Sequence, residues 1–156
     1  MARESGTKLV ADNRKARHDY HLDEKIEAGI VLAGSEVKSL REGKITLKDG
    51  YARVTRDGQL ELLSVHIAPW SHAAHGAPDP ERPRRLLMHR QEIDRLAGKT
   101  RERGYTLIPT RVYFKEGRAK VEIALARGKE GHDKRQDLKA SEAKREMERA
   151  LKSSRR

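Results

Sequence analysis

Residues 111–135, RVYFKEGRAKVEIALARGKEGHDKR, decide the fold around which the rest of the chain is organised. An apolar strand is followed by a turn at residues 115–117, and apolar residues then alternate with polar ones over residues 120–125. This pattern predicts a β-hairpin, because successive side chains of a strand point to opposite faces. The apolar pattern stops at Ala126, where a cationic segment begins without a spacer. The stretch therefore predicts a packed hairpin that leads directly into a basic tail.

The composition is strongly basic. Among 156 residues, 35 Lys/Arg stand against 24 Asp/Glu, which gives a net charge of +11. Such a charge attracts polyanions, but it does not distinguish RNA, DNA, the ribosome and an anionic membrane as partners. The chain has no cysteine, which excludes disulfides and cysteine-ligated zinc. It also lacks an apolar run long enough to span a bilayer and the pattern of a signal peptide, so we expect a cytoplasmic protein without membrane contact.

Further strands precede the hairpin. Apolar residues fall on even positions over residues 20–32, with Glu24 as the one misfit, and Gly29 indicates a bend or a bulge. Residues 35–43 have the capping and stop residues of a short helix, and Asp57-Gly58 is a strong hairpin signal. Pro109 indicates an edge or a bulge in the strand that begins the 111–135 hairpin.

These segments predict a mainly β fold, an OB-like closed antiparallel barrel of about six strands with two or three short helices. We expect residues 13–126 to form this barrel and residues 1–12 to form a flexible lead, in which residues 8–11 could add an edge strand. Residues 127–156 carry eleven Lys/Arg against six Asp/Glu and only a thin apolar stripe. Because ordering each residue costs about 1–2 kcal/mol, we expect this tail to be disordered when free and helical only against a surface.

The sequence offers little that resembles a catalytic or metal site. His72 and His75 lie in a proline-rich loop with Asp79 and Glu81, but no rigid element holds these four side chains together. Serine-nucleophile turns, Walker loops and Gly-x-Gly-x-x-Gly loops are missing from the sequence. We therefore expect no metal, no cofactor and no enzymatic activity.

Two basic stretches suit nucleic acid. In the first, Arg14, Lys15 and Arg17 can neutralise phosphates, while His18 and Tyr20 offer flat faces for bases. The alternative for this stretch is a solvated run of charge before a strand. In the second, residues 127–135, two glycines allow close approach to a backbone and His132 can stack; the alternative is a solvated tail. Glu27 can accept hydrogen bonds from RNA, or it can form an ordinary salt bridge.

Six segments of the chain together resemble the SsrA-binding protein family, also called small protein B, the partner of bacterial transfer-messenger RNA. The segments follow the order and spacing of the family, and they are 13–20 (NRKARHDY), 27–30 (EAGI), 34–41 (GSEVKSLR), 84–89 (RRLLMH), 104–109 (GYTLIP) and the pair 128–129 (GK) with 132–135 (HDKR). The resemblance covers about residues 8–145. Two departures stand in the tail, where Arg127 replaces the usual Lys and Gly131 replaces a larger residue.

This resemblance implies a specific function. The family is a non-enzymatic OB-like barrel that binds the tRNA-like domain of transfer-messenger RNA and promotes its alanine charging by alanyl-tRNA synthetase. With elongation factor Tu and GTP, it delivers that RNA to 70S ribosomes stalled without a stop codon. Trans-translation then rescues the ribosome and tags the incomplete peptide. We expect a monomer that contacts these proteins through the RNA.

The resemblance also assigns residues to two surfaces. The surface for transfer-messenger RNA comprises Asn13, Glu27, Arg41 and Leu87, to which the residues themselves add Arg14, Lys15 and Arg17. The surface for the small-subunit RNA of the ribosome comprises His18 and the tail, which enters the empty decoding centre and messenger channel and folds there, with Gly128, Lys129, His132, Asp133, Lys134 and Arg135. We expect substitution of Asn13 or Glu27 to weaken RNA binding and to leave stability nearly unchanged.

Two other functions compete with this interpretation. A ribosomal protein or general translation factor of OB type would have a similar charge and fold, and it would reside stably on a ribosomal subunit. An RNA-processing enzyme is a weaker alternative, since it would need a carboxylate cluster or a metal site.

Overall fold

A long β-hairpin forms the spine of the computed structural model, which describes residues 6–71, 77–102, 104–129 and 131–154; within the last range, the side chains of 131–134, 136, 137 and 154 are not described. Strand β8 (Tyr105–Lys115) pairs with β9 (Arg118–Gly128) along its whole length. The two are joined by Glu116 and Gly117, whose φ angles are 51° and 78°. A two-residue loop with both φ angles positive matches the twist of the strands, so the predicted hairpin is confirmed.

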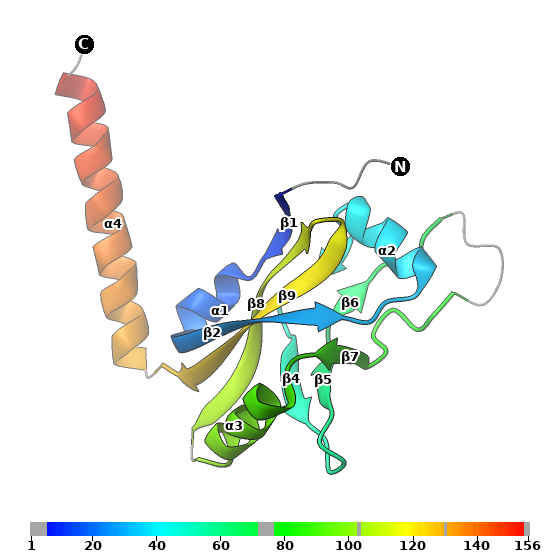
Figure 1. Cartoon of the computed structure of the whole chain (residues 1–156). Helices are drawn as coiled ribbons and strands as arrows, with labels where there is room; N and C mark the ends of the chain where they lie inside the picture. Colours follow the sequence, from blue (N-terminus) through cyan, green and yellow to red (C-terminus); the bar gives the residue numbers. More distant parts are fainter. Residues whose placement is uncertain (1–5, 72–76, 103, 130, 155–156) are drawn as a thin grey trace.

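The main sheet closes into a ring. Its strand order is β1-β8-β4-β5-β7-β2-β9, and the additional β8–β9 pairing joins its ends, so that six strands form the ring and β1 lies outside it on the edge of β8. All of these pairings are antiparallel. Figure 1 shows β8 and β9 crossing the centre of this barrel. The expected closed antiparallel barrel of about six strands is therefore confirmed.

The other elements cover the barrel or extend from it (Figure 1). A separate two-stranded sheet is made by β3 and β6. The described residues contain four helices, one more than the upper expectation. The remaining bounds are β1 (Thr7–Asp12), α1 (Arg14–Asp19), β2 (Tyr20–Ile30), α2 (Gly34–Arg41), β3 (Ile45–Thr46), β4 (Tyr51–Val54), β5 (Leu60–Leu63), β6 (His66–Ile67), β7 (Arg84–Leu87), α3 (Arg90–Arg101) and α4 (Gly131–Ser154).

Strand irregularities fall where the sequence pattern breaks. The register of β2 against β9 shifts between Leu22 and Glu24, which explains why Glu24 breaks the even-position pattern. The register of β8 against β9 shifts between Pro109 and Arg111, as the proline predicts. Gly29 holds no bulge; it pairs with both β9 and β7, at the point where β2 passes from one neighbour to the other.

The expectation of a flexible lead over residues 1–12 is wrong for residues 7–12. These residues form β1 and pair with residues 111–115 of β8, with one bulge between Leu9 and Ala11. The alternative of an edge strand was the correct one, and its span is longer than the four residues proposed. Backbone pairing along the free edge of β8 stabilises this polar segment, whose side chains do not give a strong strand signal.

The tail forms a helix in the structure, and its disorder in the free protein stays a prediction. Residues 131–154 form the helix α4, which stands away from the barrel in Figure 1. Lys, Ala, Glu and Arg make up 13 of these 24 residues, and all four are good helix formers. Arg135 and residues 138–153 are all exposed, including the apolar Leu138, Met147 and Leu151. Over these residues the helix depends on local propensity rather than on the burial that stabilises most protein helices.

A buried ion pair holds the outer wall of the barrel together. Arg84 of β7 is fully buried, and its Nε donates to Oε2 of Glu36 at 2.9 Å. The same guanidinium donates to the backbone oxygens of Val65 at 2.6 Å and Pro80 at 2.8 Å. Arg82 also donates to the Glu36 carboxylate, with its Nε 3.2 Å from Oε2. One side chain of α2 therefore fixes β7 and the loop before it.

The environment of Glu36 favours its charged form. Burial raises the pKa of Glu36, but hydrogen bonds from Arg82, from the Ala33 amide and from Arg84 outweigh it and hold the pKa below its ordinary value. A carboxyl with a depressed pKa in the folded state stabilises the fold above its ordinary pKa, and that contribution is lost as the pH falls through the depressed value.

Helix α1 depends on one buried amide. Asn13 is 4% exposed, and its Oδ1 accepts from the backbone N–H of Ala16 at 3.1 Å, which caps the helix. Its Nδ2 donates to the backbone oxygens of Leu47 at 3.2 Å and Pro109 at 2.8 Å. The helix was missed from sequence because six residues are too few for a periodic pattern, and the cap's partners at residues 47 and 109 lie far along the chain.

We predict that Arg84→Ala lowers the free energy of unfolding by about 3–5 kcal/mol, because it leaves the buried Glu36 carboxylate short of a partner. Urea unfolding at neutral pH measures this change. Arg85→Ala is the matched control, since Arg85 is the exposed neighbour, and it should change stability by less than about 0.5 kcal/mol. Glu36→Gln should also flatten the loss of stability on acidification. Equal stability of Arg84→Ala and Arg85→Ala would contradict the role given to the ion pair.

We predict that Asn13→Ala lowers the free energy of unfolding by about 2–4 kcal/mol, through the lost cap and two unpaired carbonyls. This replaces the expectation that Asn13 is dispensable for stability. Chemical unfolding of this variant beside Lys15→Ala, an exposed residue of the same helix, gives the comparison. An Asn13→Ala protein as stable as Lys15→Ala would show that the three hydrogen bonds contribute little.

Candidate nucleic-acid interface

The residues expected to bind nucleic acid separate into two groups in the structure. Asn13, Arg14, Lys15 and Arg17 lie on or at the start of α1, whereas Glu27 lies near the other end of β2. Tyr20, which follows α1, and Glu27 are seven residues apart on one strand, or about 23 Å at about 3.3 Å per residue. The first group therefore does not join the surface that contains Glu27.

Glu27 and Leu87 line one hollow of about 510 Å³, which we call the β2–β7 face. Leu87 is 52% exposed and offers an apolar surface to this hollow. Gly29 lies beneath it, where an added Cβ would come within 3.4 Å of Leu87 Cβ. The same hollow is lined by three cations that the sequence analysis missed, Lys115, Arg118 and Lys120. The sequence signal that could have found them is the spacing of Arg118 and Lys120, because residues two apart on a strand lie on the same face.

Glu27 is part of a network of hydrogen bonds and charges. Its Oε2 lies 3.3 Å from the Lys115 ammonium. The neighbouring phenol of Tyr113 also bonds to Glu27; burial, followed by the charges of Glu27 and Glu122, raises the pKa of Tyr113 to about 12. Tyr113 is therefore a hydrogen-bond donor at neutral pH. A ligand with hydrogen-bond donors could replace Lys115 at this carboxylate without leaving a buried charge.

Arg41 adjoins the β2–β7 face through Phe114. The Arg41 guanidinium carbon lies 4.5 Å from the centre of the Phe114 ring, a cation–π contact. Phe114 lines one hollow with Leu87 and another with Arg41. Three of the expected RNA-binding residues, Glu27, Arg41 and Leu87, therefore lie around one part of the barrel.

The second group forms what we call the α1 face. Arg14 is exposed there, Lys15 pairs with Asp49 at 3.4 Å, and Arg17 pairs with Asp12. His18 Nδ1 lies 3.0 Å from Asp19 Oδ1. These cations are displayed on a helix that Asn13 fixes to the barrel, so Asn13 positions this face while its own side chain is committed to internal hydrogen bonds.

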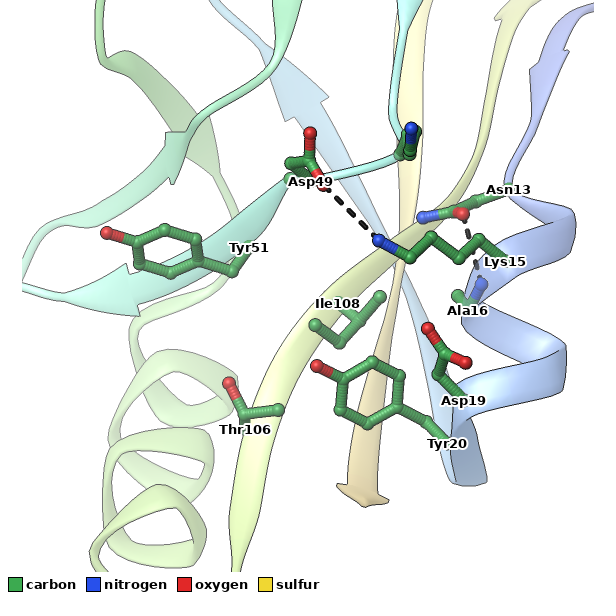
Figure 2. Close-up of a pocket in the computed structure, with 11 residues that line it drawn as sticks. Asn13, Lys15, Ala16, Asp19, Tyr20, Asp49, Tyr51, Thr106 and Ile108 are labelled. Atoms are coloured by element: carbon green, nitrogen blue, oxygen red, sulfur yellow. Dashed lines mark hydrogen bonds and ion pairs between the residues drawn. The ribbon is translucent and has the colours of Figure 1, made fainter. Parts of the chain in front are cut away.

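A cavity of about 280 Å³ lies between α1 and strands β4 and β8. Figure 2 shows Tyr20 and Tyr51 on two of its sides, with Thr106 and Ile108 between them. Lys15 reaches across its rim to Asp49. Sequence analysis missed the contributions of Lys48, Asp49 and Tyr51, because they lie about 30 residues from α1 and carry no motif.

The α1 face is joined directly to the base of the tail. Gly128 pairs with Tyr20 at the end of β9, so the barrel strand runs two residues past the expected boundary at 126. The backbone N–H of Lys129 donates to the Asp19 oxygen at 2.9 Å, and its ammonium donates to the Arg17 oxygen at 3.1 Å. In Figure 1, α1 lies beside the start of α4.

Some expected site residues fall outside the described part of the chain. His132, Asp133 and Lys134 are within α4, but their side chains are not described, and His72 and His75 lie in the undescribed range 72–76. Arg135 is exposed. Across the described residues, no group of three His, Asp or Glu side chains could hold a metal ion, and no helix is long and apolar enough to cross a membrane.

Known proteins match this chain over nearly its whole length. The family model described as SmpB protein matches residues 10–153. The SsrA-binding protein of Acidothermus cellulolyticus is 56% identical over 151 residues, which cover 97% of this chain and 94% of that protein. The SsrA-binding protein of Symbiobacterium thermophilum is 58% identical over 143 residues, which cover 91% and 90% of the two chains.

A solved structure is similar to this chain in both fold and sequence. It is described as "tmRNA-SmpB: a journey to the center of the bacterial ribosome", and it matches with a TM-score of 0.66 and 48% identity over 78% of this chain and 85% of that one. Sequence, family model and three-dimensional fold thus agree. The chain belongs to the SmpB family of SsrA-binding proteins.

Proposed function

We propose that this protein binds the tRNA-like domain of transfer-messenger RNA and delivers it to stalled ribosomes for trans-translation. The observation that carries the proposal is the separation of two surfaces on one barrel. The β2–β7 face lies at one end of β2, while the α1 face and the base of the tail lie at the other. Such an arrangement allows the protein to hold one RNA while it contacts another.

The β2–β7 face suits recognition of a folded RNA. An exposed leucine offers an apolar contact, Glu27 accepts from base or ribose donors, and Lys115, Arg118 and Lys120 lie around the hollow to meet phosphates. RNA recognition of this kind reads shape and unpaired loops, as an RNA with a tRNA-like elbow would present. Asn13 contributes indirectly, and we assign Arg14, Lys15 and Arg17 to the α1 face.

The α1 face and the tail suit the ribosome. Lys129 fixes the base of the tail, and α4 extends from it with its described side chains exposed. The described side chains of α4 are exposed, so the helix gains little stability from their packing, and it suits a polyanionic channel that it can fill on binding. We infer that Gly128, Lys129, His132, Asp133, Lys134 and Arg135 enter the decoding centre and the messenger channel when no messenger RNA occupies them.

The role is one of binding and delivery, without catalysis. Elongation factor Tu with GTP and alanyl-tRNA synthetase would act on the same RNA, so that the protein meets them through it. A monomer suffices, since each surface is complete within one chain. The working compartment would be the cytoplasm, where ribosomes and transfer-messenger RNA meet.

We predict that two changes separate the two activities. Leu87→Ala should weaken binding of a tRNA-like-domain transcript about fivefold or more, since an exposed apolar contact at the centre of an interface contributes at least about 1 kcal/mol. Leu151→Ala is the matched control, because it removes a leucine of similar exposure from α4. Truncation after Lys129 should leave that affinity within about threefold at one salt concentration and abolish peptide tagging on stalled ribosomes.

Filter binding at fixed salt and a reconstituted tagging reaction measure these two outcomes. Thermal unfolding of Leu87→Ala should match that of Leu151→Ala, because both side chains are more than half exposed. Parallel loss of RNA binding and tagging in the truncated protein would contradict the division into two surfaces.

A further inference from the structure

We propose that the cavity between α1, β4 and β8 is a binding pocket for a single unstacked nucleotide of an RNA. We call it the Tyr20–Tyr51 pocket. It lies on the α1 face and shares no lining residue with the hollow that contains Glu27 and Leu87. This inference deepens the proposed function, since it names a second RNA contact, and it rests on that function for the source of the RNA.

The walls of the pocket provide aromatic surface. Tyr51 is 40% exposed on β4, and Tyr20 is half-buried against Ile108 and Ala16. Ala52 pairs with Leu107, so the residues that flank this pair, Tyr51, Thr106 and Ile108, point away from the barrel interior. Tyr51 and Tyr20 thus bracket a floor formed by Ile108 and Thr106, as Figure 2 shows. Every base has a flat face that stacks on such a ring, whatever its identity.

The pocket is built from parts that cannot move independently. Gly50 allows the turn before β4 to pack closely against the barrel, because an added Cβ would lie 2.7 Å from Val65 Cγ2 and 3.0 Å from Pro109 Cγ. Asn13 holds the other side of the same turn through the Leu47 oxygen, and it also caps α1. The two walls therefore keep their spacing without a ligand, which lowers the entropic cost of binding one.

The rim of the pocket carries charges of both signs. Lys48 is exposed beside the opening, and Lys15 crosses it. Asp19 and Asp49 also line the cavity, and their carboxylates accept hydrogen bonds from base amino groups. At about 280 Å³, the cavity is just below the volumes that hold drug-sized molecules, about 300–1,000 Å³. One nucleotide fits this size, and a helical segment does not.

The first test titrates the full-length protein with adenosine, guanosine, cytidine and uridine 5′-monophosphates, followed by NMR. We expect shifts at Tyr20, Tyr51 and Thr106. Tyr51→Phe keeps the ring and should bind within about twofold of the unaltered protein, whereas Tyr51→Ala and Tyr51→Leu should bind about fivefold or more weakly. Tyr51→Leu keeps an apolar side chain on the strand. It therefore tests the loss of the aromatic ring even if Tyr51→Ala folds poorly. Shifts confined to other residues, or unchanged affinity in Tyr51→Leu, would overturn the proposal.

The second test identifies the source of the nucleotide by ultraviolet cross-linking and tryptic digestion. One arm uses a tRNA-like-domain transcript and the other uses small ribosomal subunits. A cross-link on the peptide 49–53, which carries Tyr51, supports the pocket in either arm and names transfer-messenger RNA or ribosomal RNA as the source. Its absence from both arms would overturn the proposal. Failure of Leu87→Ala to weaken transcript binding concerns the β2–β7 face alone, so the two hypotheses fail separately.

Discussion

The pairing of β9 with both β2 and β8 is the constraint on which the rest of the structure depends. One strand of eleven residues lies between two others of equal length, and its bonds to both close the sheet into a ring. Each neighbour accommodates the curvature through a register shift, at Leu22/Glu24 and at Pro109/Arg111. Because β9 also leads into the tail, the closure of the barrel fixes the point from which the tail leaves.

Closure also explains why two surfaces stay apart. β2 crosses the barrel and carries Tyr20 beside α1 at one end and Glu27 beside Leu87 at the other. A line of charged side chains runs along the outside of the sheet, from Asp12 to Arg111 at 3.8 Å and from Arg111 to Glu122 at 3.9 Å. The barrel is thus a rigid spacer, and a protein that grips one RNA at one end can present cations and a tail at the other.

The sequence predicted those features that depend on neighbouring residues. Alternation over residues 120–125 and the turn at 115–117 located the central hairpin, and the misfit of Glu24 marked a real bulge. Features that depend on distant partners were missed. Helix α1 needs Asn13 to reach residues 47 and 109, and β1 needs the open edge of β8. The tail has a composition that favours a helix and too little apolar surface to pack it, so the sequence predicted the helix that forms α4 only against a surface.

The candidate site shows the same difference between features that depend on neighbouring residues and features that depend on distant ones. Glu27, Arg41 and Leu87 lie around one part of the barrel, whereas the Asn13 side chain makes internal hydrogen bonds and the neighbouring cations lie on the α1 face. The roles of all these residues in RNA binding stay predictions. The sequence singled out Lys15 and Tyr20 of the Tyr20–Tyr51 pocket, but it gave no sign of their assembly with β4, β8 and the turn before β4, which lie far along the chain. Physical assembly of distant segments, which no local pattern encodes, accounts for each of these differences.

Hydrogen exchange followed by mass spectrometry tests most directly whether a closed barrel carries a tail that packs weakly against it. In the free protein, amides of β8 and β9 should exchange only through global unfolding, while those of residues 131–154 should exchange at least about a hundredfold faster, as expected for a helix whose described side chains are exposed. On ribosomes with an empty messenger channel, the tail should become protected. Two results would contradict the division between a rigid body and a tail that orders on binding. One is protection of the tail equal to that of β9 in the free protein. The other is an equal increase in tail protection on ribosomes whose messenger channel is filled.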